Sequence, residues 1–94
     1  MVIKSFRHKG LGLFFQTGRK SGIQPHHAAR IRLILGAVDD ASGSQDLDSR
    51  RLGLHKLSGE LAGFWAVKVS GNWRIVFRFE GEDATEVDYP DFHH

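Results

Sequence analysis

The last third of the chain alternates apolar and polar residues, a pattern typical of antiparallel strands that bury one face. The alternation covers FWAVKVS (64–70) and NWRIVFRF (72–79), and the short SGN between them predicts a tight hairpin. A second turn leads into DATEVDYP (83–90), which reads as a third strand ended by Pro90. The apolar face of this three-stranded meander must be covered by other parts of the chain. It carries Trp73, Ile75, Phe77 and Phe79.

Two helices are expected to provide that cover. Apolar residues at helical spacing predict the first helix over 8–18, with Gly18 at the left-handed stop position. The second helix, over about 25–41, begins at Pro25, whose missing N–H costs nothing in a first turn. Its apolar stripe consists of Ala28, Ile31, Leu35 and Val38, widened by Ile34 and Ala41.

The order of these elements predicts an α+β fold. The segment VIKSF (2–6) is expected to be a short first strand, so that an N-terminal strand and two helices pack on the meander in a sheet of about four strands. Ninety-four residues leave room for one hydrophobic core, so residues 1–94 are expected to form a single domain. The long connection 42–63 contains a possible helical turn at 44–48, and connections of this length are often functional.

The charges are unevenly distributed along the chain. The net charge is only +2, yet residues 1–38 contain seven Lys and Arg residues and no acid. A basic surface of this kind attracts polyanions such as nucleic acid, although the same number of charges also suits a solvated helix face. The sequence has no cysteine, no signal peptide and no apolar run of the roughly 20 residues that span a bilayer. A cytoplasmic protein without membrane contact is expected.

Four polar residues near the meander form a candidate active site. His55 lies in the long connection, Arg74 is on the uncovered face of a strand, and Asp91 and His93 follow the last strand. Two imidazoles, a guanidinium and a carboxylate suffice to cleave RNA without a metal ion: one group deprotonates the 2′-OH, another protonates the leaving 5′-oxygen, and the cation stabilises the phosphorane. The spacing of the His and acidic residues indicates no metal site, and no cofactor motif is present.

The segments that carry these residues resemble the HigB-like killer toxins of the RelE superfamily. The specific parts are the LHxL-x-G loop at 54–59, the NWR at 72–74 and the terminal Y-x-D-x-H at 89–93, and the opening IKSFRHKGLGLFF is similar as well. The resemblance spans nearly the whole chain. It implies a ribosome-dependent mRNA endoribonuclease of a type II toxin–antitoxin system.

The resemblance also implies partners and residue roles. The partners would be a cognate helix-turn-helix antitoxin (HigA-like), the ribosome with its mRNA, and operator DNA reached only through the antitoxin complex. His55 and His93 would form the proton-transfer pair and Arg74 would stabilise charge. Asp91 would orient a group or contact a base. The weaker candidates for substrate contact are Lys56, Tyr89 and Phe92.

Two positions depart from the pattern of some relatives. Ser58 stands where some of them have a lysine three residues after the loop histidine, and Lys56 is the nearby residue that could supply that charge. Phe92 stands where some have a tyrosine, and its ring can stack on a base but cannot donate a proton. Two alternatives stay open at this stage, a ParE-like toxin that inhibits DNA gyrase without cleaving RNA, and a plain binding module that represses a promoter with its partner.

Overall fold

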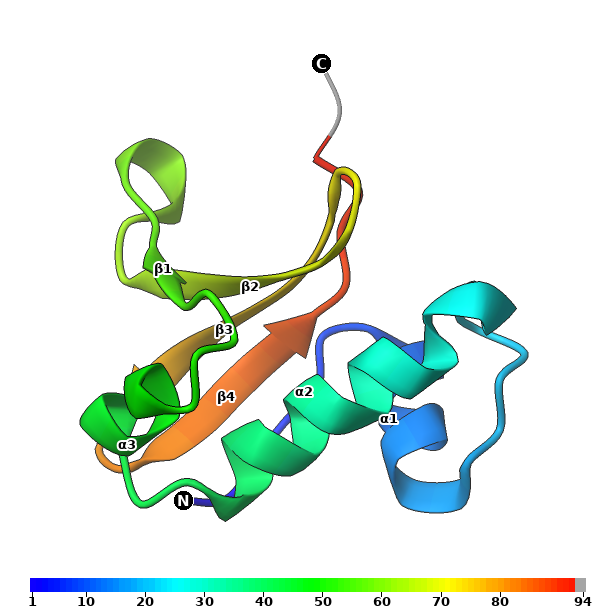
Figure 1. The fold of residues 1–94 in the computed structure, drawn as a ribbon, viewed down its shortest axis with the longest axis horizontal. Helices are drawn as coiled ribbons and strands as arrows, with labels where there is room; N and C mark the ends of the chain where they lie inside the picture. Colours follow the sequence, from blue (N-terminus) through cyan, green and yellow to red (C-terminus); the bar gives the residue numbers. More distant parts are fainter. Residues whose placement is uncertain (93–94) are drawn as a thin grey trace.

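A computed structural model describes residues 1–92 and shows helices α1 and α2 beside a four-stranded antiparallel sheet (Figure 1). The strands lie in the order β1-β2-β3-β4. The predicted α+β class and the meander are confirmed. The elements are α1 (Lys9–Thr17), a 3-10 turn (Pro25–His27), α2 (Ala28–Asp40), α3 (Ser44–Ser49), β1 (His55–Lys56), a second 3-10 turn (Gly59–Leu61), β2 (Phe64–Ser70), β3 (Trp73–Glu80) and β4 (Asp83–Asp88).

Helix α1 begins and ends where its capping residues allow. The Nδ1 atom of His8 accepts a hydrogen bond from the Leu11 N–H at 3.0 Å, which satisfies one of the free donors of the first turn. Gly18 ends the helix with φ of 80°, and its N–H donates to the Phe14 carbonyl at 2.8 Å. Gly10, an unfavourable residue within a helix, has a packing reason, because a Cβ there would lie 2.6 Å from the Gly22 Cα.

Helix α2 supplies most of the helical contribution to the core. Pro25 starts a 3-10 turn, and the α-helix begins three residues later. The predicted stripe is buried as expected. Its buried members are Ala28, Ile31, Ile34, Leu35 and Val38. No helix within residues 1–92 combines the length and apolar character that a membrane span requires.

The fourth strand differs from the one expected at the N-terminus. Residues 2–6 make only two isolated parallel bridges to β4, Ile3 with Ala84 and Phe6 with Val87. Residues 2–7 exchange backbone hydrogen bonds with Ala84 and Val87. The β3–β4 register shifts between these points, and Glu86 adopts a left-handed φ of 54°, which interrupts the parallel pairing. The fourth strand of the sheet is instead β1, within the long connection.

The two faces of the sheet have different surroundings. The helix-covered face contains Val67, Ile75 and Phe77, all fully buried in one cluster with side chains of α1 and α2. We call the opposite side the outer face. Residues directly opposite each other on antiparallel strands project to the same side, so the register assigns to it His55, Phe64, Ala66, Lys68, Arg74, Val76, Arg78 and Asp88.

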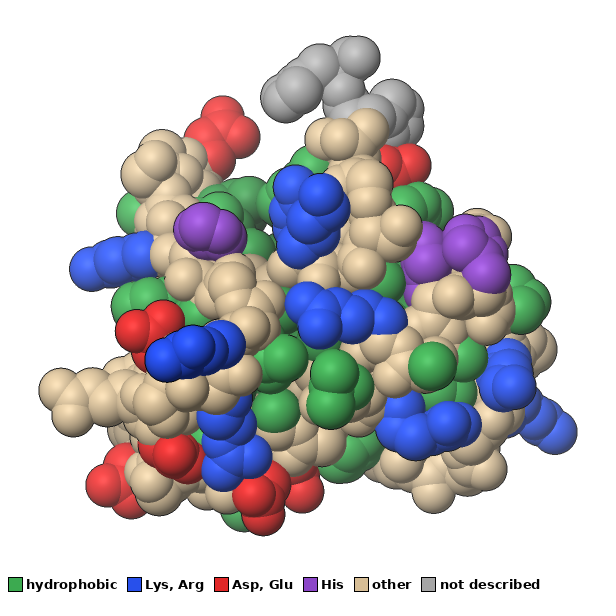
Figure 2. Space-filling view, in the orientation of Figure 1, with side chains coloured by type: hydrophobic (Ala, Val, Ile, Leu, Met, Phe, Trp, Pro, Cys, Tyr) green, Lys and Arg blue, Asp and Glu red, His purple; other side chains and the backbone are tan. Residues whose placement is uncertain are grey.

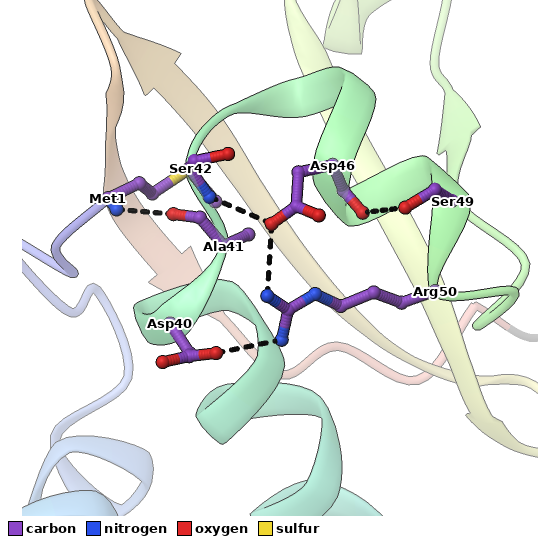
Figure 3. Close-up of polar contacts among 7 residues, drawn as sticks. All are labelled: Met1, Asp40, Ala41, Ser42, Asp46, Ser49 and Arg50. Carbon is purple, nitrogen blue, oxygen red and sulfur yellow. Dashed lines mark hydrogen bonds and ion pairs between the residues drawn. The ribbon is translucent and has the colours of Figure 1, made fainter.

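Polar contacts brace the corner between α2 and α3, where the long connection starts (Figure 3). The Arg50 guanidinium pairs with Asp40 at 3.1 Å and with Asp46 at 2.9 Å, and the Ser42 N–H donates to the same Asp46 carboxylate at 2.9 Å. The Ser42 N–H, followed by Arg50, holds the pKa of Asp46 below its usual 3.8. The Met1 amino group donates to the Ala41 carbonyl. This corner anchors the connection that leads to His55.

Candidate active site on the outer face

His55 lies at one end of a row that crosses the whole sheet. It pairs with Ala66 on β2, Ala66 pairs with Val76 on β3, and Val76 pairs with Asp88 on β4. Neighbouring strands lie about 4.8 Å apart, so His55 and Asp88 are about 14 Å apart along this row. The two middle residues are small or medium in size and are almost completely buried. The row therefore has one titratable side chain at each end and an apolar centre.

Arg74 lies on the same face as His55, two residues before Val76 on β3. Its guanidinium donates to the Gly71 carbonyl at 2.7 Å and to the Trp73 carbonyl at 3.1 Å, which holds the group beside the β2–β3 hairpin. No ion pair within residues 1–92 includes Arg74. The guanidinium is thus held by neutral acceptors and is not engaged by an ion pair in this part of the chain.

The C-terminal segment runs antiparallel to the start of β3. The Arg74 N–H donates to the Pro90 carbonyl at 3.0 Å, and the Phe92 N–H donates to the Asn72 carbonyl at 2.8 Å. The fold therefore places Phe92 beside the NWR segment, although about 20 residues separate them in the chain. His93, the second histidine of the predicted proton-transfer pair, lies outside the described residues.

Asp91 approaches this region from the other side of the sheet. It forms a bridge directly opposite Trp73, whose side chain belongs to the helix-covered face. Its negative charge also contributes to raising the pKa of Tyr89, after the larger effect of burial. Asp91 is therefore near the NWR segment but is not aligned with His55 on the outer face.

Lys56 and Tyr89, the two weaker candidates for substrate contact, are not brought to the outer face. Lys56 follows His55 and so projects to the opposite side, where its Nζ lies 5.9 Å from the centre of the Trp65 ring. Tyr89 is 4% exposed and belongs to the core. The lysine charge expected near the loop histidine is therefore not supplied by Lys56 in this arrangement.

Tyr89 belongs to a buried cluster with His27 and Trp73. Its hydroxyl and the His27 Nδ1 share a hydrogen bond of 2.5 Å, and the Tyr89 and Trp73 rings lie 4.6 Å apart. Burial, followed by the neighbouring charge of His26, lowers the pKa of His27. This cluster was not among the sequence-based predictions. Position 27 precedes Ile31 by one helical turn, so the apolar stripe of α2 pointed to it.

A second group of charges lies at the far end of the outer face. Glu86 accepts from Arg7 at 2.6 Å and from Arg78 at 3.2 Å, and the hydrogen bond from Arg7 is the main cause that lowers the Glu86 pKa. Both guanidinium groups also lie over the Phe64 ring, at 5.6 and 5.4 Å from its centre. Part of the basic N-terminal half is thus neutralised by acids of the sheet.

The remaining Lys and Arg side chains are spread over the surface. Figure 2 shows many of them across one face, whereas Asp and Glu gather mainly toward its lower left. A hollow of about 750 Å³ between α3 and the β3–β4 turn is lined by Trp65, Phe79 and Asp46 but by none of the predicted site residues. Within residues 1–92, no three His, Asp or Glu side chains are grouped closely enough to hold a metal ion.

Comparisons with known proteins identify the family of the chain. Residues 4–93 match the family model of the RelE-like toxin of type II toxin–antitoxin system HigB. The chain is also 41% identical over 92 residues to the Endoribonuclease HigB of Proteus vulgaris, covering 98% of this chain and 100% of that protein. The resemblance inferred from the loop histidine, the NWR segment and the C-terminal residues is confirmed. The chain belongs to the HigB family of RelE-like toxins, the toxic components of type II toxin–antitoxin systems.

Proposed function

We propose that this toxin is an endoribonuclease that cleaves mRNA during translation and thereby stops growth. The observation that carries the proposal is the placement of His55 and Arg74 on one uncovered face of the sheet, with the C-terminal segment hydrogen-bonded beside Arg74. The name of the Proteus vulgaris relative, an endoribonuclease, supports the same reaction. This activity requires a cytoplasmic location, where translated messages occur.

The reaction is assigned to side chains alone. A histidine takes the proton of a ribose 2′-OH, the 2′-oxygen attacks the adjacent phosphorus, and the bond from phosphorus to the 5′-oxygen breaks. A second group returns a proton to that 5′-oxygen, so the products are a 2′,3′-cyclic phosphate and a 5′-OH. His55 and His93 are proposed for the two proton transfers, because an imidazole titrates near neutral pH. Arg74 stabilises the charge of the phosphorane.

The ribosome is proposed to hold the substrate in place. The outer face is an open surface, and the backbone positions of His55 and Arg74, two strands apart, are roughly 10 Å or more from each other. A flexible RNA strand on such a surface is poorly oriented, and orientation is worth several kcal/mol of a reaction barrier. The basic side chains would dock on ribosomal RNA, an attraction that weakens as salt increases. Translated messages should therefore be cleaved far faster than naked RNA, and equal rates would contradict ribosome dependence.

A type II toxin has an antitoxin partner. We propose that the partner of this chain is a HigA-like protein with a helix-turn-helix, and that the complex binds operator DNA through the antitoxin. In the described part of the toxin, only strands and a 3-10 turn follow α3. The helix that reads the bases is therefore assigned to the helix-turn-helix of the partner.

The decisive experiment expresses three chains in cells that lack the antitoxin and maps new 5′ ends in translated messages. The wild type should generate 5′ ends within reading frames, and His55→Ala should generate none. Lys56→Ala is the matched control, because Lys56 is adjacent in sequence but projects to the other side of the sheet. It should cleave like the wild type. Growth arrest with intact messages and gyrase-dependent DNA breaks would overturn the proposal in favour of a ParE-like mechanism.

A further inference from the structure

Lys68 is a second cation of the outer face, beside Arg74. The two residues are direct partners in the β2–β3 register, so their side chains project to the same side. The Arg74 N–H points away from β2, toward the Pro90 carbonyl, so the pair is of the non-hydrogen-bonded kind, whose Cα atoms are only about 4.5 Å apart. Like charges in this arrangement destabilise a sheet.

No ion pair within residues 1–92 offsets this repulsion. The five ion pairs within residues 1–92 include neither Lys68 nor Arg74. Arg7 and Arg78 at the other end of the face differ, because both form ion pairs with Glu86. Asp88 lies on the same face but is in none of these ion pairs. Two adjacent cations that form no ion pair present a site for an anion.

Lys68 also stands between the two residues of the proposed mechanism. Strand β2 lies between β1 and β3, and Lys68 is two residues along β2 from Ala66, the partner of His55. Such a diagonal separation is about 7 to 8 Å between Cα atoms, which a lysine side chain spans. An anion held by Lys68 and Arg74 is therefore within reach of His55.

The backbone at Lys68 is held in place. Strand β1 begins at His55, opposite Ala66, and does not cover the position opposite Lys68. The side chain of Arg30, from α2, bonds to the Lys68 backbone there. Its Nε and Nη2 donate to the Lys68 carbonyl at 3.2 and 3.1 Å, and Nη2 also donates to the Leu52 carbonyl at 3.3 Å. The register shifts immediately after Lys68, and bulges of this kind direct a side chain at a functional site.

We propose that Lys68 contacts the scissile phosphate together with Arg74 and stabilises its added negative charge during cleavage. This inference rests on the proposed function. It assigns to Lys68 the cationic role that Lys56 cannot fill from the opposite side of the sheet.

The test measures single-turnover cleavage of a ribosome-bound message by the wild type, Lys68→Gln, Lys68→Arg and Lys56→Gln. Lys68→Gln should lower the rate constant about 100-fold, the typical effect of removing one group that stabilises transition-state charge. Lys68→Arg should recover most of the rate because it restores the charge. Lys56→Gln should remain within about twofold of the wild type, because Lys56 projects to the other side of the sheet.

Two further readouts separate substrate contact from misfolding. The melting temperature of Lys68→Gln should equal or exceed that of the wild type, because the substitution removes a repulsion. The affinity for a ribosome-bound message with a 2′-deoxy cleavage site should depend less on salt, with a slope smaller by about one.

The outcomes distinguish this inference from the proposed function. A wild type that cleaves, with Lys68→Gln within about twofold of it, overturns the role of Lys68 and leaves the endoribonuclease intact. A wild type that does not cleave the message overturns both. A slow Lys68→Gln with a lowered melting temperature also counts against phosphate contact and indicates a structural role.

Discussion

The two faces of the same sheet carry different side chains, although they share every backbone hydrogen bond. On the helix-covered face, Val67, Ile75 and Phe77 are fully buried against α1 and α2. On the outer face, Lys68 and Arg74 are neighbours that form no ion pair among residues 1–92, and the buried apolar residues Ala66 and Val76 lie at the centre. The first arrangement lowers the free energy of the folded state. The second costs stability through repulsion and is explained by an anionic substrate.

His27 and His55 show the same contrast between a buried and an exposed position. His27 is 3% exposed, bonded to Tyr89, and has a pKa lowered mainly by burial. His55 is exposed on a two-residue strand. One histidine lies in the core, where burial disfavours its charged form, and the other is exposed to solvent. Substitutions on the covered face should therefore change stability, and those on the outer face should change activity.

The largest expected effect on stability is that of Phe77→Ala. Removing a fully buried aromatic ring from the core should lower the free energy of unfolding by about 3 to 5 kcal/mol, much of the 5 to 15 kcal/mol typical of a domain. Urea denaturation followed by circular dichroism measures this loss. Lys68→Gln on the neighbouring strand is the control and should change it by less than about 0.5 kcal/mol. Equal losses in both variants would remove the distinction between the faces.

On the outer face, Arg74→Ala is expected to lower the cleavage rate more than the removal of any other cation. The rate constant for cleavage of a ribosome-bound message should fall about 100- to 1000-fold, because the phosphorane loses a fixed charge. The urea midpoint should hardly move, since within residues 1–92 the guanidinium bonds only to carbonyls beside the hairpin. Full activity of a folded Arg74→Ala protein would show that the outer face is not the site of the reaction.

Tyr89→Phe removes a single oxygen atom from the buried cluster. The change leaves the ring in place but removes the partner of the His27 Nδ1, so stability should fall by about 1 to 3 kcal/mol. Under conditions where the variant is fully folded, its cleavage rate should match that of the wild type. A rate loss in the folded variant would instead support the sequence-based prediction that Tyr89 contacts the substrate.

The smallest effect is a dependence of stability on pH through His27. Its pKa in the folded state is below the ordinary 6.5, so the unfolded chain binds the proton more readily. The contribution is fully present above about pH 6.5 and is lost as the pH falls through the lower, folded-state pKa. Urea denaturation between pH 7.5 and 5 should show this decline in the wild type and a weaker one in His27→Gln. Identical slopes would show that burial does not lower the pKa of His27. The pKa values of Asp46 and Glu86 are also lowered, but these carboxylates change stability at more acidic pH.

Much of the fold follows from local patterns. The alternation over 64–79 predicted β2 and β3, and the stripe from Ala28 to Val38 predicted α2. The short helix at 44–49 was anticipated as a helical turn. The fourth strand was placed at the N-terminus, however, and β1 has only two residues, too few to show any alternation. Its pairing with β2 is a long-range contact that leaves no local pattern.

The sequence by itself determined the covered face of the sheet, the two main helices and the residue types available for RNA cleavage, because periodicity and motif composition are properties of neighbouring residues. Only the tertiary structure decided which of these residues lie together. Strand register set His55, Lys68 and Arg74 on one side and turned Lys56 to the other, since a shift of one position reverses a side chain. Packing buried Tyr89 against His27, because a chain this short recruits even its polar aromatic residues into the core.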